Sequence, residues 1–221
     1  MNNLLNFLRT LKSNGLHIQT VYDIGAHHGL WSKQIQQSVL HDSKFYLFEA
    51  NPAYESILKS TNFPYLCGTV LSNPGRTHVE FFNGSNTGDS YYKETTKSYD
   101  NQGFISLPCI TLDTLVSQLQ LPPPDFIKID TQGSELDILN GASNLIGEVS
   151  LIYIECPIIK YNDGAPCIQD YLDFFKYKNF IPIDIFEIHR SEDTLLQIDI
   201  LFMSKAAKFK YLSKNDFIRI S

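Results

Sequence analysis

Cysteine is scarce in this sequence and shows no metal-binding spacing. The four cysteines, Cys67, Cys109, Cys156 and Cys167, form no Cys-x-x-Cys pair and have no histidine at zinc-finger spacing. This pattern argues against a structural zinc site. We expect reduced, mostly buried thiols in a cytoplasmic protein.

An excess of positive charge and a long apolar run are also missing. The net charge of -6 argues against binding to a nucleic-acid backbone, because such binding depends on lysine and arginine side chains that neutralise phosphates. No apolar run approaches the roughly twenty residues that span a bilayer, and the first residues do not resemble a secretion signal. We therefore expect a soluble, unprocessed chain with no membrane span and no nucleic-acid partner.

Apolar and aromatic residues are plentiful, at 43% and 13% of the 221 residues, which is enough for one substantial core. We predict a single domain over residues 1–221, without internal repeats. Leucines at helical spacing predict an amphipathic helix over residues 3–14, within an N-terminal segment 1–15. We expect its leucine-rich face to cover one face of the sheet or a neighbouring subunit, in which case a homodimer could form on it.

Short apolar strands then alternate with helical patterns. Strands are predicted at residues 20–24, 44–49, 65–70, 105–110, 125–130, 149–155, 181–186 and 196–203, and helices at 30–39, 52–60, from 111, 134–140 and 168–177. We expect the last two strands to form an antiparallel hairpin at the sheet edge. This order predicts an α/β fold with a doubly wound, mostly parallel sheet and helices on both faces.

The turn after the first strand and the acid that ends the second strand predict a nucleoside site. Gly25 and Gly29 let the backbone turn sharply and approach a ligand, while Glu49 can accept both hydroxyl hydrogens of a ribose. A pyrophosphate site would need Gly-x-Gly-x-x-Gly, whereas this turn reads Asp-x-Gly-x-x-x-Gly. Asp23 is then placed to meet a positively charged amino-acid group, directly or through water. The pattern indicates S-adenosylmethionine.

Residues 83–103 are polar and show no periodicity. A stretch of this kind is either a surface insertion or a functional loop. In the second case it forms a lid or substrate loop, and Asn86, Ser90, Tyr91 and Tyr92 are its candidate contact residues.

The stretch from Lys128 to Ala142, which reads Lys-Ile-Asp-Thr-Gln-Gly-Ser-Glu and then Leu-Asn-Gly-Ala at the helix end, carries a family resemblance. With the Thr-Leu-Asp-Thr-Leu segment from Thr111 and the Phe-Glu-Ala-Asn-Pro run from Phe48, it resembles the FkbM family of S-adenosylmethionine-dependent methyltransferases. The resemblance extends over about residues 20–205. It implies a class I methyltransferase (Rossmann-like) fold and methylation of a hydroxyl group. His27 and His28 depart from the smaller or polar residues usual there.

Further cofactor contacts follow from the resemblance. Asn51 would border the adenosine, Leu71 and Ser72 would lie against the adenine, and Asp130 would lie beside the cofactor at the end of the central strand. Asn51 before a proline is equally consistent with a helix cap, and Ser72 with a plain turn.

Two acids are expected at the carboxyl edge of the sheet, where ligands bind in such folds: Asp130 and, on the next strand, Glu155. Methyl transfer to oxygen requires a positioned hydroxyl and removal of its proton. Asp130, Glu155 or His189 could act as the base. Alternatively, Asp130 and Glu155 hold a divalent ion such as Mg²⁺ that lowers the hydroxyl pKa. Structural roles remain open: a helix cap for Asp130 and a solvated loop position for His189.

The leading hypothesis is O-methylation of a hydroxylated small molecule, a natural product or a sugar of a surface glycan. N-methylation is less favoured, because Asp130-Thr131-Gln132-Gly133 stands where amino methyltransferases carry Asn/Asp-Pro-Pro-Tyr. A third hypothesis is a catalytically silent, cofactor-binding scaffold that supports a partner enzyme.

Overall fold

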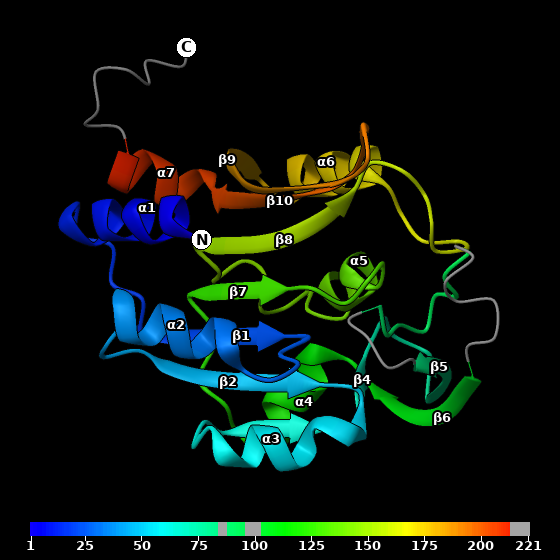
Figure 1. Cartoon of the computed structure of the whole chain (residues 1–221). Helices are drawn as coiled ribbons and strands as arrows, with labels where there is room; N and C mark the ends of the chain where they lie inside the picture. Colours follow the sequence, from blue (N-terminus) through cyan, green and yellow to red (C-terminus); the bar gives the residue numbers. More distant parts are fainter. Residues whose placement is uncertain (84–87, 96–102, 213–221) are drawn as a thin grey trace.

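A seven-stranded sheet forms the centre of the structure (Figure 1). The computed structural model describes residues 1–83, 88–95 and 103–212. The strand order is β3-β2-β1-β7-β8-β10-β9. The parallel strands are β1 (Thr20–Ile24), β2 (Lys44–Glu49), β3 (Tyr65–Cys67), β7 (Phe126–Ile129) and β8 (Leu151–Pro157). This confirms the predicted doubly wound, mostly parallel α/β sheet.

Helices cover both faces of this sheet. Alternate strand residues face opposite sides, so that Val21 and Phe45 belong to one apolar core and Tyr22 and Phe48 to the other. The first core is closed by α1 (Asn2–Ser13), α2 (Leu30–Ser38), α3 (Glu55–Ser60) and α7 (Lys205–Leu212). The second is closed by α4 (Leu112–Leu119), α5 (Glu135–Asn140) and α6 (Ile168–Tyr177).

The leucine face of α1 is part of the chain's own core. Leu4, Leu5, Leu8 and Leu11 are all buried against the first core. The first of the two expectations for this face, that it covers the sheet, is confirmed. The alternative of a dimer surface on these leucines is wrong, because the chain itself covers them.

The strand predicted at residues 65–70 is two strands in two sheets. β3 ends at Cys67, and β4 (Val70–Leu71) joins a small sheet of order β4-β6-β5 with β5 (His78–Asn83) and β6 (Gly103–Ile110). Gly68, with φ of +81°, lies between them and turns the chain. The helix predicted at 52–60 likewise begins as a separate 3-10 turn, η1 (Pro52–Tyr54), before α3. β5 and α7 were not predicted.

The edge hairpin is confirmed and is longer than expected. β9 (Phe180–Ser191) and β10 (Thr194–Ser204) pair antiparallel along their length, and β10 also pairs antiparallel with β8. His189 lies opposite Gln197 within this pairing. The expectation of a loop histidine is therefore wrong, since His189 belongs to a strand.

Part of the polar stretch 83–103 is attached to the body of the protein. Ser90 pairs with Phe82 in a β-bridge, and the backbone of Thr95 donates to the carbonyl of Tyr161 at 2.7 Å. Asn86 lies outside the described residues. Within the part of the chain that the structure describes, none of the helices has the length and apolar character needed to cross a bilayer.

Candidate active site

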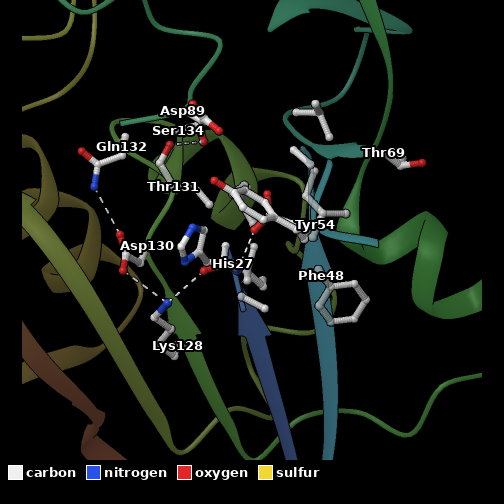
Figure 2. Close-up of a pocket in the computed structure, with 18 of the residues that line it drawn as sticks. His27, Phe48, Tyr54, Thr69, Asp89, Lys128, Asp130, Thr131, Gln132 and Ser134 are labelled. Atoms are coloured by element: carbon white, nitrogen blue, oxygen red, sulfur yellow. Dashed lines mark hydrogen bonds and ion pairs between the residues drawn. The ribbon is translucent and has the colours of Figure 1, made fainter. Parts of the chain in front are cut away.

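A cavity of about 250 Å³ opens at the carboxyl ends of β1, β2 and β7 (Figure 2). Its wall combines the turn after β1, the end of β2, residues 69–71 and the segment after β7. Five residues that were proposed from the sequence line it: Gly25, Glu49, Leu71, Tyr91 and Asp130. The cavity therefore lies where ligands bind in open α/β sheets.

The turn after β1 has a conformation that requires glycine at Gly25. Its φ is +74°, and a Cβ there would lie 1.8 Å from the carbonyl oxygen of Asp130. The backbone of the turn consequently lies against the end of β7, and both border the cavity. Gly29 has φ of +69° and caps α2, where a Cβ would lie 2.9 Å from the side chain of Leu47. Gly29 thus shapes the turn without lining the cavity.

Glu49 is held rigidly at the end of β2. One carboxylate oxygen accepts a hydrogen bond from the backbone N–H of His27 at 2.7 Å, and the other accepts from the N–H of Asn51 at 2.9 Å. Burial raises the pKa of Glu49, and these two amide bonds oppose that effect. Because a carboxylate oxygen has two lone pairs, each oxygen can still accept a ligand hydroxyl.

Asp23, Lys128 and Asp130 form a charged row at the base of the cavity, and the last two of them line it. The Nζ of Lys128 lies 3.3 Å from Asp23 and 3.3 Å from Asp130, and it donates to the carbonyl of Gly25 at 3.1 Å. Burial lowers the pKa of Lys128, but the two carboxylates outweigh it and raise that pKa above its ordinary value. Asp23 is fully buried, accepts from Ser32 at 2.6 Å and does not line the cavity. The structure therefore does not place Asp23 at the cavity surface for a direct ligand contact, and a contact through water stays a prediction.

Asn51 and Ser72 do not line the cavity but contact residues that do. Asn51 caps η1 through its side-chain oxygen, and its amide donates to Asp89 at 2.6 Å. The hydroxyl of Ser72 lies 3.3 Å from that of Tyr91. Asp89 and Tyr91 line the cavity, whereas Asn51 and Ser72 do not. The helix-cap interpretation of Asn51 is confirmed.

Residues 88–95 meet helix α5 through two tyrosines. The hydroxyls of Tyr91 and Tyr92 both donate to one carboxylate oxygen of Asp137, at 2.6 Å and 2.9 Å. Burial raises the pKa of Tyr92 to about 12, with Asp137 adding to the effect. Tyr91 is thereby fixed in the cavity wall.

The rings of His27, His28 and Tyr54 form an aromatic cluster at the cavity. This cluster was not predicted from the sequence. His27 stacks on His28 with ring centroids 3.8 Å apart, and Tyr54 meets His27 edge-on at 4.3 Å. All three line the cavity, and Figure 2 shows His27 and Tyr54 pointing into it. Burial and the neighbouring His28 lower the pKa of His27. The histidines were visible as a departure from the family pattern, whereas nothing in the sequence singled out Tyr54.

Glu155 and His189 lie in a second polar group beside the cavity. The amide of Gln132 donates to Glu155 at 2.9 Å and to Asp130 at 3.3 Å, so it connects the two predicted acids. The Nε2 of His189 lies 3.5 Å from an oxygen of Asp199 on β10. Burial raises the pKa of Glu155, and nearby carboxylates, Asp130 first, raise it further. Neither Glu155 nor His189 lines the cavity.

This arrangement argues against the metal site expected between Asp130 and Glu155. The Gln132 amide nitrogen occupies the position between the two carboxylates, and it donates to both. An amide N–H group is not a metal ligand, so the pair is bridged by a hydrogen-bond donor instead. Asp199 was not identified from the sequence, although an acid within the apolar run Ile198–Ile200 was an available signal.

Comparison with known proteins adds sequence relatives. The sequence profile of the methyltransferase FkbM domain matches residues 23–182. The hexuronic acid methyltransferase AglP of Haloferax volcanii is 26% identical over 116 residues, which are 50% of this chain and 46% of AglP. The match thus spans about half the length of this curated relative.

Solved structures with the same fold are much more distant in sequence. An O-methyltransferase from Bacillus cereus, solved with S-adenosylhomocysteine, has a TM-score of 0.52 and 12% identity, covering 92% of this chain and 82% of that one. Magnesium protoporphyrin IX methyltransferase from Synechocystis, with bound S-adenosylmethionine, has a TM-score of 0.50 and 11% identity, covering 92% and 77%. The fold is that of class I methyltransferases. With the profile matching well over half of its length, the chain belongs to the FkbM methyltransferase domain family.

Proposed function

We propose that this chain is an S-adenosylmethionine-dependent methyltransferase that transfers a methyl group to a hydroxyl of a sugar. The observation that carries the proposal is the position of Glu49, whose carboxylate is fixed by two backbone amides on the wall of a cavity beside the Gly25 turn. Such a carboxylate matches the paired hydroxyls of a ribose.

The charge of the cavity suits a cationic cofactor. Glu49, Asp89 and Asp130 contribute acids to the wall, and Lys128 is the lysine there, already paired with two carboxylates. S-adenosylmethionine carries a positive sulfonium and an ammonium group. We place its ribose at Glu49, its adenine toward Leu71 and its methionine end near Gly25 and Asp130. Asp23 then acts only through Lys128.

Asp130 is the base that we assign to the transfer. The acceptor oxygen attacks the sulfonium methyl, the carbon–sulfur bond breaks, and the hydroxyl proton passes to a carboxylate. Of the three predicted bases, Asp130 alone lines the cavity, and its side chain is 43% exposed. Glu155 and His189 do not line the cavity. Glu155 is connected to Asp130 by the amide of Gln132, which donates to both carboxylates.

A sugar acceptor is favoured by one relative. AglP is named as a hexuronic acid methyltransferase, and its similarity to this chain covers half of each protein. The acids around the cavity lead us to expect that this chain prefers a neutral sugar over a uronic acid, since a second carboxylate would be repelled.

The first test is calorimetric titration with S-adenosylhomocysteine, with NADH as the control ligand. We expect binding of the former alone, in the micromolar range. Transfer of a labelled methyl group is then measured on matched acceptors: a neutral hexoside, the corresponding uronic acid and the corresponding amino sugar. Methylation of nitrogen would replace the proposal by the N-methyltransferase hypothesis. Tight binding without transfer to any acceptor would favour the scaffold.

A further inference from the structure

Three strands at the edge of the large sheet bring a histidine and two carboxylates together. Asp199 on β10 lies directly opposite Glu155 on β8, and His189 comes from β9 on the other side of β10. One ligand atom from each residue lies within 4.8 Å of the other two. The group, called here the edge triad (Glu155, His189 and Asp199), is separate from the wall of the 250 Å³ cavity.

The edge triad contains an unsatisfied acceptor. The Oδ1 atom of Asp199 is buried and has no hydrogen-bond partner among the described residues. The Nε2 of His189 lies 3.5 Å from this atom. A buried acceptor without a partner carries a desolvation cost, so such an atom calls for a ligand.

The negative charge of the edge triad is not balanced by a fixed cation. In the described part of the chain, neither Glu155 nor Asp199 forms an ion pair with lysine or arginine. The imidazole of His189 lies within 4 Å of both Asp199 and Glu187. Two largely buried carboxylates that face each other across a strand pair repel one another. Either a bound proton or a bound cation relieves this repulsion.

Neighbouring side chains already orient the carboxylates. Tyr153 donates to the other oxygen of Asp199 at 2.8 Å, and Gln132 and Gln197 each donate to one oxygen of Glu155. Each of these oxygens keeps a second lone pair. Outer hydrogen bonds of this kind fix the ligands of protein metal sites.

From this arrangement we infer that the edge triad binds a divalent transition-metal ion through Glu155, His189 and Asp199. Donors that share one ion at about 2.0–2.2 Å lie at most about 4.4 Å apart, so the triad needs to close by only a few tenths of an ångström. One imidazole and two carboxylates suit Mn²⁺ or Zn²⁺ better than Mg²⁺ or Ca²⁺.

The site has a place in the proposed reaction, and this step rests on the proposed function. Gln132 donates to both Glu155 and Asp130, and Asp130 lines the cavity. An ion held by Glu155 would therefore fix the Gln132 amide and, through it, the position of the carboxylate that we assign as the base.

The experiment is a titration of the chelator-treated, tag-free protein with Mn²⁺, and separately with Zn²⁺, without any cofactor. Calorimetry, and electron paramagnetic resonance for Mn²⁺, are expected to give one site. Asp199→Asn and His189→Gln should each weaken binding by at least about tenfold. Both replacements are close in shape to the original, and Asn retains an acceptor for Tyr153.

Asp184→Asn is the matched control, because it removes one exposed charge from the same strand as His189. Its affinity should stay within about twofold of the unchanged protein, as expected for a screened surface charge. Circular dichroism confirms folding of every variant. Lack of binding by the folded protein, or equal weakening by Asp184→Asn and Asp199→Asn, would overturn the inference. Because the titration contains no cofactor, its result does not depend on binding of S-adenosylhomocysteine.

Discussion

Lys128 lies 3.3 Å from a carboxylate oxygen of Asp23, a residue that has no exposed surface. The two residues are register partners on β7 and β1, at the middle of the parallel sheet. Their contact holds the base of the cavity, because the same ammonium group also reaches the carbonyl of Gly25 and the carboxylate of Asp130.

Lys128→Met should destabilise the protein strongly. It leaves Asp23 charged and buried without its cation, which costs about 3–5 kcal/mol in comparable cases. Urea unfolding measures the loss. Lys59→Met, at an exposed position of α3, is the control and should change the free energy of unfolding by less than about 0.5 kcal/mol. Equal effects of both substitutions would contradict the role given to Lys128.

Gly25→Ala should disrupt the cavity. A Cβ at this position would overlap the carbonyl of Asp130 at 1.8 Å, and the backbone φ of +74° is unfavourable for alanine. We expect a loss of several kcal/mol, or failure to fold, measured by thermal unfolding and by the yield of folded protein. Gly147→Ala is the control, because nothing lies within 4 Å of its Cβ. A normally stable Gly25→Ala protein would show that the turn is not held against β7.

Glu49→Gln should weaken binding of S-adenosylhomocysteine by about 10- to 100-fold. The amide keeps one acceptor oxygen but loses the charge-assisted bonds that we assign to the ribose, worth about 1.5–3 kcal/mol. Calorimetry measures the affinity. Glu55→Gln removes an exposed acid six residues further on and serves as the control. Unchanged affinity in a folded Glu49→Gln protein would exclude the proposed ribose contact.

Tyr171→Phe should lower stability by about 1.5–3 kcal/mol, since it removes a hydrogen bond to a charged, fully buried group. The hydroxyl of Tyr171 donates to Glu135 at 2.6 Å, and neither side chain is exposed. Glu135 also accepts from the backbone N–H groups of Thr131 and Gly133, so it fixes the chain that follows Asp130. Denaturant unfolding is compared with that of Tyr177→Phe, whose ring is 81% exposed. A loss of stability no larger than that of Tyr177→Phe would contradict the role given to the hydroxyl of Tyr171.

Stability should fall as the pH rises from about 4 to 6, and Asp199 should contribute to this fall. Burial, followed by the charge of Asp130, raises the pKa of Asp199 to about 6, against the opposing bond from Tyr153. The folded state then binds the proton of Asp199 more tightly than the unfolded chain does. The stability gained from this proton is complete below the unfolded pKa and is lost as the pH rises through the folded pKa. In metal-free buffer, Asp199→Asn should remove on the order of 1–3 kcal/mol of this decline. An identical pH profile for both proteins would contradict the shift.

The sheet and its central turn could be predicted because their signals are local. An apolar strand, a glycine turn and a strand ending in Glu49 are contiguous patterns, and Gly25 and Glu49 do line the cavity. The role of Asp23 could not be predicted in the same way. Its partner Lys128 is more than a hundred residues away, and only the pairing of β1 with β7 brings the two together.

Other errors have equally specific causes. Residues 65–70 form one apolar run, but Gly68 divides it between two sheets. His189 stands in a polar stretch that looked like a turn, because the outer strand of a hairpin is solvated on one side. Asp199 carried no motif, and its importance comes only from the residues opposite it on β8 and β9.

The shared carboxylate of Asp137 has a consequence for how a ligand enters. Tyr91 and Tyr92 both bond to it, so the part of the cavity wall formed by residues 88–95 is joined to α5, the helix that follows Asp130. The conformational entropy of this wall is lost during folding and need not be lost again when a ligand binds. This part of the wall is therefore preorganised, and the affinity of a ligand there depends on its complementarity to a surface that already exists.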